Sequence, residues 1–425
     1  MEFEEALEEL ESRQPERMVP NLARIRALAE LMDDPQLTYP TVHVTGTNGK
    51  TSTSRLSARI LCAHGLSTGV YTSPHLQSVT ERLALCGDEI SRDEFGREYE
   101  RLLPYLHEVD RRGIRVTYFE TLTALAYLWF ADKPVDAAVF EVGMGGAWDA
   151  TNLVRPQVAV FCQVDLDHPE LGSTVEEVAR EKAGIIKEGA TVVIADPSPA
   201  VLAAVRTRAL ELGVPTLIRG QDWWLRDRDL AVGGWRMTVA TTRAEYANLF
   251  LPLQGYQVEN AATAIVACEA FLGRPLSPDP LREALSGATA PGRMEVLSRR
   301  PLVVVDGAHN PAGARALAAS VAETFGRDRL FLVLACSANK DIDGIARGLA
   351  SLHPTMVFAS RNSSQRSAPA ERMAEACATA GLDVKTCASV EEALDAARDA
   401  AEESDLILIS GSLYTVADAR RAIVT

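Results

Sequence analysis

Short apolar runs alternate with helical patterns through the first two thirds of the chain. The β-branched run Thr41–Val44 is followed by a glycine-rich turn and then by Ser52–His64, where apolar residues recur at helical spacing. Further continuous apolar runs occupy Val135–Val142, Gln157–Val164 and Thr191–Ala195, as in strands buried on both faces of a parallel sheet. Strands that alternate with helices predict a doubly wound α/β domain, whose ligands gather at the carboxyl ends of the strands.

The same patterns predict the elements around this sheet. Helices are expected over residues 2–12, Asn21–Met32, Arg97–Arg111, Thr121–Phe130 and Val258–Phe271. A strand is expected at Gly69–Thr72 and a small β excursion at Trp223–Met237.

A second domain follows a cluster of proline and glycine between Ser277 and Arg300. Beyond the cluster, four short apolar strands separated by helices are predicted at Leu302–Val305, Leu330–Leu334, Thr355–Ala359 and Leu406–Ser410. The predicted fold class is therefore α/β. Residues 1–288 are predicted to form a phosphate-loop-containing, doubly wound, mostly parallel sheet with N-terminal helices, and residues 289–425 a smaller Rossmann-like α/β domain.

The glycine-rich turn has the composition of a phosphate-binding loop. Its candidate phosphate-binding residues are Gly46, Thr47, Asn48, Gly49, Lys50, Thr51 and Ser52. Glycines allow backbone N–H groups to converge, while the helix N-terminus and Lys50 add positive charge. The hydroxyl of Thr51 or Ser52 is a candidate ligand for the Mg²⁺ that accompanies a nucleotide. The full phosphate-loop pattern has glycine where this chain has Val44, so an ordinary strand-to-helix turn is the alternative.

Charge and cysteine content exclude some classes of protein. With 425 residues and a formal net charge of −15, the chain is not expected to bind nucleic acid or an anionic membrane, because both require a basic surface. The seven cysteines include no CxxC pair, so we expect them to be reduced core or surface residues. The acidic N-terminus and the lack of an 18-residue apolar stretch predict a cytoplasmic protein.

Three side chains near strand ends are candidates for metal and phosphate chemistry. Glu141 and His168 each follow a predicted strand and could ligate Mg²⁺ together with phosphate oxygens. The alternatives are that Glu141 caps the following glycine turn and that His168 is an ordinary loop histidine. Lys182 is typical of a helix-surface lysine, and a functional role for it is the less favoured interpretation from spacing alone.

The predicted second domain carries a polar turn at the end of its first strand. Asp306 could accept ribose hydroxyls and His309 could reach phosphates, whereas Asp, Gly, Asn and Pro are also common turn formers. Arg293, in the predicted hinge, could clamp a phosphate or be a solvated linker arginine.

Taken together, these motifs resemble the folylpolyglutamate synthase and dihydrofolate synthase family of the Mur ligase superfamily. The resemblance runs in order through VTGTNGKT (44–51), TSPHL (72–76), YFETLTAL (118–125), EVGMGGAWDATN (141–152), DLDHPELGSTVEEVAREKAGIIK (165–187), APGRMEV (290–296), DGAHNP (306–311) and GSLYTVADAR (411–420). The order and spacing of the set are far more specific than any one motif. The motifs DGAHNP and GSLY favour the folate branch over the cell-wall ligases.

The resemblance implies ATP-dependent amide formation through an acyl phosphate. The acid is dihydropteroate or a reduced folate, the amine is that of L-glutamate, and the enzyme is expected to be a monomer. Two Mg²⁺ sites are implied, and a monovalent cation is possible in this family. By matching motifs, the metal ligands would be Thr51, Ser52, Ser73, Glu141 and His168, and Lys182 would carry a carbamate. The nucleotide contacts would include Asn260, Arg293, Asp306 and His309. The acid substrate would meet Ser73, His75, Thr117, Tyr118, Phe119, Glu120, Trp148, Asp149 and Ala150.

Two departures from the family pattern bear on substrate choice. Thr51 replaces the last glycine of GTNGKG, which leaves open which hydroxyl binds Mg²⁺. Trp148 stands in a motif that usually reads GGRLDATN, so the pterin side of the pocket is expected to differ. Two other hypotheses therefore remain: a Mur-superfamily ligase for another acid, and a nucleotide-binding switch or regulatory ATPase without ligase activity.

Overall fold

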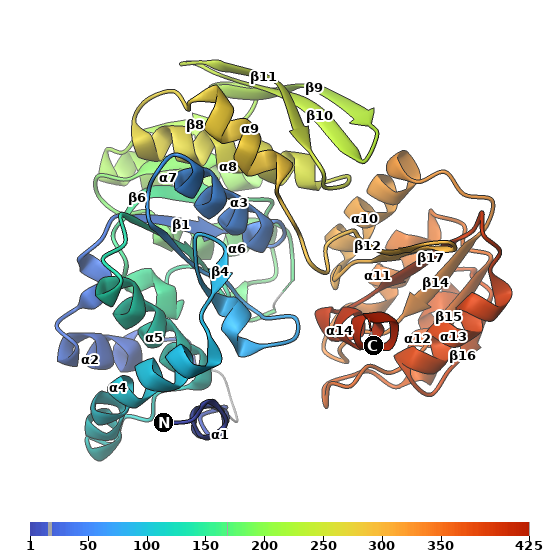
Figure 1. Cartoon of the computed structure of the whole chain (residues 1–425), viewed down its shortest axis with the longest axis horizontal. Coiled ribbons are helices and arrows are strands. Elements are labelled where there is room, and N and C mark those ends of the chain that lie inside the picture. The colour runs from blue at the N-terminus through green and yellow to red at the C-terminus, as the bar shows by residue number, and fades with distance from the viewer. Residues whose placement is uncertain (16–18, 168, 425) are drawn as a thin grey trace. The chain divides into compact units, whose positions relative to one another are not determined.

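The chain folds into two compact units, each with its own sheet (Figure 1). The computed structural model describes residues 1–15, 19–167 and 169–424. The first unit comprises Met1–Arg228, Arg236–Phe250 and Glu259–Ala288. The second comprises Asp229–Trp235, Leu251–Val258 and the chain from Thr289 onward. Within the described ranges, no helix has the length and apolar character needed to cross a bilayer.

The first unit is built on a mostly parallel sheet with the strand order β4-β3-β2-β5-β1-β6-β7-β8. The strands are β1 (Thr41–Thr45), β2 (Thr68–Tyr71), β3 (Leu83–Leu85), β4 (Asp88–Glu89), β5 (Ala137–Glu141), β6 (Pro156–Phe161), β7 (Thr191–Ile194) and β8 (Thr216–Ile218). Strands β3 and β4 are antiparallel additions at one edge, and all other neighbours are parallel. The predicted doubly wound sheet is confirmed, with β1 at its centre.

Helices flank this sheet. They are α1 (Phe3–Glu11), α2 (Ala23–Leu31), α3 (Lys50–Ala63), α4 (Arg92–Arg111), α5 (Tyr118–Asp132), α6 (Val175–Lys182), α7 (Pro199–Leu212), α8 (Gln257–Leu272) and α9 (Pro278–Ser286). Short 3-10 turns occur at Pro35–Leu37, Val79–Arg82, Ala150–Leu153, Pro169–Leu171 and Ala183–Ile185. Helix α3, which follows the glycine turn, packs against β1, β2 and β5.

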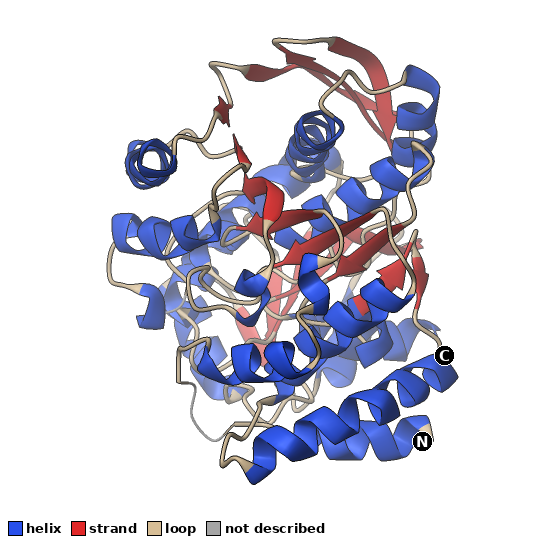
Figure 2. Ribbon diagram, turned by 90° about the vertical axis from the view of Figure 1, so that its left-hand side faces the viewer, coloured by secondary structure: helices blue, strands red, loops and turns tan. Residues whose placement is uncertain are grey.

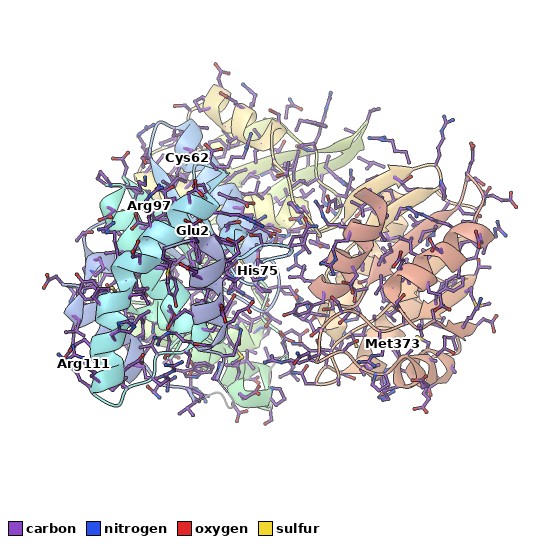
Figure 3. All side chains as sticks on the ribbon, turned by 60° about the horizontal axis from the view of Figure 1, so that its bottom comes forward. Glu2, Cys62, His75, Arg97, Arg111 and Met373 are labelled. Carbon is purple, nitrogen blue, oxygen red and sulfur yellow. A yellow bond between two sulfur atoms is a disulfide. The ribbon has the colours of Figure 1, made fainter. Side chains whose placement is uncertain are left out.

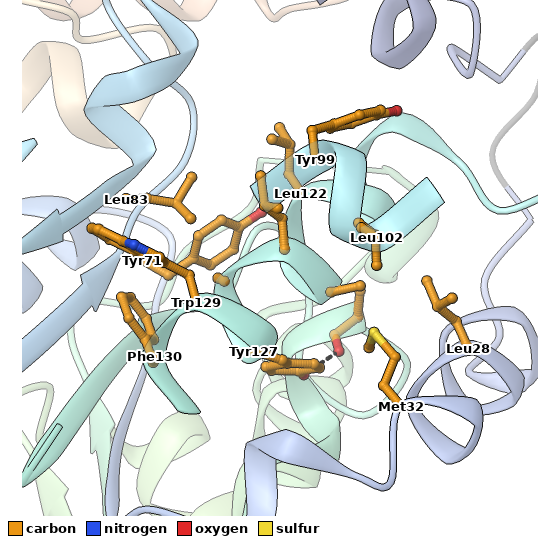
Figure 4. Packing of buried hydrophobic residues seen from close by; sticks show 14 of the residues in the cluster. Leu28, Met32, Tyr71, Leu83, Tyr99, Leu102, Leu122, Tyr127, Trp129 and Phe130 are labelled. Carbon is orange, nitrogen blue, oxygen red and sulfur yellow. Dashed lines mark hydrogen bonds between the residues drawn. The ribbon is translucent and has the colours of Figure 1, made fainter. Parts of the chain in front are cut away.

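Strand β1 separates two hydrophobic clusters on one face of the sheet. Its residue His43 pairs in register with Phe140 of β5 and with Ala159 of β6. Phe140 belongs to an aromatic cluster with α5, drawn in part in Figure 4, whereas Ala159 belongs to a separate aliphatic cluster. Between them β1 presents Thr41, His43 and Thr45, all fully buried. The central strand therefore places a polar stripe inside the protein, and those side chains need internal partners.

Helix boundaries differ from the predicted ones where a capping residue was overlooked. Helix α4 begins at Arg92, five residues before the predicted start, because the Ser91 hydroxyl accepts from the backbone N–H of Glu94 at 3.2 Å. Helix α5 likewise begins at Tyr118, after Thr117, whose side chain forms a capping box with Glu120. In both helices the cap, rather than apolar periodicity, sets the start.

The predicted β excursion is confirmed but is longer than expected. Strands β9 (Trp223–Ala231), β10 (Gly234–Thr241) and β11 (Glu245–Leu251) form a separate three-stranded sheet (Figure 2). A two-residue turn at Val232 and Gly233 joins the first pair, with Gly233 at a φ of 82°. The third strand was missed because most of its side chains are exposed or half-buried, which weakens the apolar signal.

The second unit has a six-stranded sheet with the order β12-β13-β17-β14-β15-β16. Its strands are β12 (Glu295–Arg299), β13 (Leu302–Val305), β14 (Leu330–Leu334), β15 (Met356–Ala359), β16 (Val384–Thr386) and β17 (Leu406–Ser410). Its helices are α10 (Pro311–Thr324), α11 (Ile342–Ala350), α12 (Ala370–Thr379), α13 (Val390–Ala400) and α14 (Leu413–Val424). The four apolar strands were predicted, whereas β12 and β16 lack fully buried residues and were missed.

The expectation that all seven cysteines are unpaired was wrong for two of them. Cys62, near the end of α3 and labelled in Figure 3, forms a disulfide with Cys86 in the turn after β3. The antiparallel pairing of β2 and β3 brings Cys86 to this place, since its backbone N–H donates to the Thr68 carbonyl at 3.0 Å. Neither spacing nor a CxxC pattern signals such a pair. The remaining cysteines are free and buried.

Reduction of this disulfide is expected to lower the free energy of unfolding by about 3 kcal/mol, because the bridge closes a loop between residues 24 positions apart. Urea denaturation with and without a thiol reductant measures the difference. The Cys62→Ser/Cys86→Ser variant serves as the control, since its unfolding midpoint should not respond to reductant. Equal midpoints for the wild-type protein in both buffers would contradict the expectation.

Candidate active site

The turn between β1 and α3 requires glycine at both ends. Gly46 has a φ of 152° and Gly49 a φ of 89°. A Cβ atom on Gly46 would lie 2.8 Å from that of Cys162, and one on Gly49 would lie 2.5 Å from Oδ1 of Asn260. Any larger residue at either position would displace a neighbour. The contact also brings Asn260 of α8, one of the predicted nucleotide-binding residues, against the turn.

The backbone amides of the turn fall into two groups. Those of Thr47 and Asn48 donate to the Gln163 carbonyl at 2.7 and 3.3 Å, and the Thr47 hydroxyl donates to the Asp165 carbonyl at 2.7 Å. Those of Gly49 to Ser52 belong to the start of α3, where N–H groups have no acceptor within the helix. An anion is therefore offered the first turn of α3 and its positive end.

Two lysines approach the same turn. The ammonium of Lys50 donates to the Thr47 carbonyl at 3.1 Å, and the amine of Lys182 donates to the Gly46 carbonyl at 2.9 Å. Lys182 lies at the end of α6 with only 3% of its surface exposed, so the helix-surface interpretation was wrong. Burial, together with the charge of Lys50, lowers the pKa of Lys182 to about 7.

Glu141 connects three segments at the carboxyl end of β5. One carboxylate oxygen accepts from the Thr51 hydroxyl at 2.7 Å, and the other accepts from the Ser73 backbone N–H at 3.0 Å. Glu141 is 1% exposed, and Ser52 is buried in the same turn of α3 as Thr51. The structure thus brings the predicted metal ligands together from β5, α3 and the loop after β2. His168, the remaining predicted ligand, lies outside the described residues.

The donor chemistry of this cluster fits Mg²⁺ delivered with a nucleotide. Among residues 1–15, 19–167 and 169–424, no group of three or more His, Cys, Asp or Glu side chains is arranged to hold a metal. Glu141 instead provides one carboxylate beside the Thr51 hydroxyl. Mg²⁺ commonly binds one or two carboxylates, retains water and takes its other ligands from substrate phosphates, so a complete protein cage is not required.

The loop after β5 is organised from within by Asp149. Its carboxylate accepts from the backbone N–H of Met144 at 2.9 Å and from the hydroxyl of Thr151 at 2.6 Å. Nε2 of His43 lies 2.8 Å from the same hydroxyl and donates to it, since the hydroxyl proton is directed at Asp149. Burial lowers the pKa of His43 to about 3, so the imidazole is neutral. Asp149 and Ala150 are buried, which assigns them to the frame of the loop.

Replacement of Thr151 by valine is expected to lower the free energy of unfolding by about 1–3 kcal/mol, because His43 and Asp149 would both lose a buried hydrogen-bond partner. Thr41→Val is a matched control on β1, since the buried Thr41 hydroxyl has no hydrogen-bond partner among the described residues. That control should be neutral or stabilising. Urea unfolding measures both variants, and equal effects would contradict the assigned network.

The other residues predicted to contact the acid substrate include two that cap helix α5 and two aromatic residues beside them. Thr117 and Glu120 form the capping box of α5, and Glu120 also pairs with Arg24 at 2.9 Å. Tyr118 and Phe119 are half-buried, and the Phe119 ring reaches Gly143, where a Cβ would lie 2.5 Å from its Cζ. The two aromatic rings are therefore partly exposed, whereas Glu120 is buried and Thr117 is engaged in the cap.

His75 and Trp148 complete that set. Trp148 is half-buried beside the aliphatic cluster of β6 and β7. His75 accepts at Nδ1 from Nε of Arg82 at 2.9 Å, and burial lowers the pKa of His75 to about 4. Neither Arg82 nor His43 was predicted as a site residue. His43 interrupts a β-branched strand, which was a usable signal, whereas Arg82 had none because its surroundings form only in the folded chain.

The second unit holds the remaining predicted residues. Asp306, at the end of β13, is 1% exposed and accepts from the Tyr256 hydroxyl, from Met294 N–H at 2.9 Å and from Ala308 N–H at 2.8 Å. Burial raises the pKa of Asp306, and the charge of Arg293 opposes that shift. A Cβ on Gly307 would lie 2.5 Å from a terminal nitrogen of Arg293, so Arg293 is not a free linker residue. His309 contacts the Gly307 carbonyl through Nδ1 at 2.8 Å.

Comparison with known proteins places this geometry in a family. The model for the Mur ligase middle domain matches residues 44–268, and that for the Mur ligase, glutamate ligase domain matches residues 292–413. A dihydrofolate synthase/folylpolyglutamate synthase of Mycobacterium tuberculosis is 37% identical, over 97% of this chain and 92% of its own length.

Solved structures agree with that assignment. A Mycobacterium tuberculosis folylpolyglutamate synthase complexed with ADP superimposes with a TM-score of 0.94 at 34% identity, covering 99% of this chain and 98% of the other. E. coli FolC in complex with DHPP and ADP superimposes with a TM-score of 0.89 at 31% identity, covering 100% of this chain and 98% of the other. The chain belongs to the folylpolyglutamate synthase/dihydrofolate synthase family of the Mur ligase superfamily, and it is an ATP-dependent ligase that adds glutamate to a folate or pteroate.

Proposed function

We propose that the cluster around Gly46, Lys50, Glu141 and Lys182 is the phosphoryl-transfer centre of this ligase. The observation that carries the proposal is the convergence of separate segments on one turn, with Lys182 Nζ 2.9 Å from the Gly46 carbonyl and the Thr51 hydroxyl 2.7 Å from Glu141. A carboxylate that attacks the γ-phosphate of ATP brings two anions together. Positive charge at the helix start and on Lys50 offsets that repulsion and the charge that develops on the phosphate.

Glu141, with the hydroxyls of Thr51, Ser52 and Ser73, would hold Mg²⁺, and His168 completes this predicted set. Bound there, Mg²⁺ would neutralise phosphate and carboxylate charge. The Thr51 hydroxyl donates to Glu141, so it would be placed to share a Mg²⁺ ion with that carboxylate. Once the acyl phosphate has formed, the amine of glutamate attacks its carbon, and phosphate leaves as the amide forms.

Lys182 would be carbamylated in the active enzyme. A neutral amine attacks CO₂ to give a carbamate and releases a proton, so the reaction needs the unprotonated form. The lowered pKa of about 7 supplies that form at neutral pH. The negative carbamate would also relieve the repulsion between the buried ammonium of Lys182 and the half-buried ammonium of Lys50, since Lys50 lowers the pKa of Lys182. No residue is assigned to a monovalent cation.

The acid substrate would lie against the aromatic side chains of Tyr118, Phe119 and Trp148. His75 is a further predicted contact of the acid. These rings are half-buried, so each has a surface that a pterin or aminobenzoyl ring can cover. Asp149 and Ala150 would act indirectly by fixing the loop. Asn260, Arg293, Asp306 and His309 would contact the nucleotide. The division into domains 1–288 and 289–425, a monomeric state and a cytoplasmic location belong to the same proposal.

ADP release from purified protein tests the proposal. We expect release only when ATP, L-glutamate and either dihydropteroate or tetrahydrofolate are all present, and the ratio of the two acids' kcat/KM values assigns the preferred substrate. Release with a muramyl nucleotide and another amino acid would favour a different Mur-type ligase, an outcome for which the Thr51 and Trp148 departures provide a reason. Release with ATP alone would favour a regulatory ATPase.

A further inference from the structure

Arg82 is a buried arginine without a carboxylate partner. Only 8% of its surface is exposed. Its guanidinium donates from Nε to His75 Nδ1 at 2.9 Å and lies over the ring of Tyr118, 5.5 Å from the centroid. His75 cannot supply a negative charge, because an imidazole is either neutral or positive. Burial and the charge of Arg82 lower the pKa of His75 to about 4, against the opposing effect of Glu81, and leave the ring neutral. Among the described residues, no Asp or Glu forms an ion pair with Arg82.

Arg13 provides the comparison within the same unit. It is 2% exposed, and its guanidinium contacts the carboxylates of Glu9 at 2.8 Å and Asp110 at 2.9 Å. Removing a charge from water is costly unless an opposite charge is nearby, so Arg13 shows the usual arrangement. Arg82 is buried to a similar degree with no such compensation. The missing negative charge is then expected from a bound ligand.

The position of Arg82 indicates which ligand. Its backbone carbonyl accepts from the Thr72 N–H at 2.9 Å, beside Ser73, whose own N–H contacts Glu141 at 3.0 Å. Its side chain lies against Tyr118 and His75, on the aromatic side of the site. Arg82 thus lies between the proposed metal ligands and the rings proposed to cover the acid, whereas the phosphates are offered Lys50 and the start of α3.

We propose that the guanidinium of Arg82 binds a carboxylate of the acid substrate and holds the acid with its reacting end toward Glu141. The inference rests on the proposed function, since it needs a carboxylic acid as substrate. Planar guanidinium groups bind carboxylates through paired N–H donors. Nε donates to His75, and the terminal nitrogens form no hydrogen bond with another described residue, which leaves them for the ligand, while the Tyr118 ring lies against the group.

The test compares Arg82→Met, Arg82→Lys and the control Arg13→Met. For Arg82→Met we expect KM for dihydropteroate to rise about 10- to 100-fold, the range for losing a hydrogen bond to a charged group, with KM for ATP within about twofold. Arg82→Lys should recover part of this loss. The melting temperature of ligand-free Arg82→Met should be unchanged or higher because an uncompensated buried charge is removed, whereas Arg13→Met should melt lower with an unchanged KM for the acid.

A second measurement separates binding from folding. Equilibrium binding of dihydropteroate and of its carboxamide, which has no negative charge, is measured for the wild-type protein and Arg82→Met. The wild-type protein should prefer the acid by about 10-fold or more, and the variant should lose that preference while binding the carboxamide unchanged. If the variant bound the acid and the carboxamide equally more weakly, or if its KM for the acid were unchanged, the role of Arg82 would be overturned while the proposed function would stand. Wild-type protein without acid-dependent ADP release would overturn the proposed function and this inference with it.

Discussion

Replacement of Lys50 by alanine is expected to reduce turnover by about 1000-fold or more, because in the proposed phosphoryl-transfer centre the side chain would offset charge where a carboxylate meets the γ-phosphate. The ammonium lies at the first residue of α3 and contacts the Thr47 carbonyl at 3.1 Å. No other lysine contacts the carbonyl of Thr47 in the described chain. Initial rates of ADP release at saturating ATP, acid and glutamate measure the loss.

The fold of Lys50→Ala should be unaffected, since the removed amine makes one hydrogen bond to a backbone carbonyl. Its melting temperature without ligands should therefore match that of the wild-type protein, while the stabilisation given by added ATP should fall. Lys385→Ala, at an exposed position of β16, is the matched control and should keep full activity. ADP formation by Lys50→Ala at close to the wild-type rate would refute the assignment of this turn.

Replacement of Lys182 by alanine is expected to lower kcat by about 100-fold, in the range for a positioned acid, base or charge in a water-excluded site. The cavity left by the side chain should admit a small carboxylate, so formate or acetate should restore part of the activity if a carbamate is the active form. Added chloride at the same ionic strength is the control. Equal rescue by a carboxylate and by chloride, or no rescue by either carboxylate, would argue against the carbamate.

The same lysine predicts a pH-dependent stability. Its pKa is about 7 in the folded protein against an ordinary value of 10.5, so between these pH values the unfolded chain binds more protons. In CO₂-free buffer the free energy of unfolding of the wild-type protein, relative to Lys182→Met, should therefore rise with pH from about 7 to 10.5, by at most about 1.4 kcal/mol per pH unit. Urea unfolding across this range tests it, and a difference independent of pH would contradict the burial of a titrating amine.

Prediction from the sequence succeeded for elements whose structure depends on residues adjacent in the chain. The β1–turn–α3 segment was identified because a β-branched strand, two glycines and a helix with periodic apolar residues follow one another within 23 residues. Strands at the centre of each sheet were found for the same reason, since burial on both faces leaves continuous apolar runs. Edge strands such as β12 and β16 were missed, because half-exposed strands have mixed composition.

The site could be predicted only in part. The position of Glu141 and Lys50 could be predicted because each adjoins a strand end or a glycine turn, and their joint position at one edge follows from parallel strands. The interpretation of Lys182 from spacing alone was wrong, since eight residues of amphipathic helix give no sign that the last one is 3% exposed. The disulfide between Cys62 and Cys86 was missed, because its two ends meet through sheet pairing.

By itself, the sequence determined the fold class, the strand–turn–helix segment proposed to bind phosphate and the kind of chemistry, because these depend on local periodicity and on residues adjacent in the chain. The tertiary structure decided the state of individual side chains. His43 meets Thr151 across 108 residues, and Lys182 meets Gly46 across 136. Burial and charge compensation arise from such distant contacts. Only the folded chain therefore distinguishes the neutral His43, the perturbed Lys182 and the uncompensated Arg82 from ordinary residues of the same type.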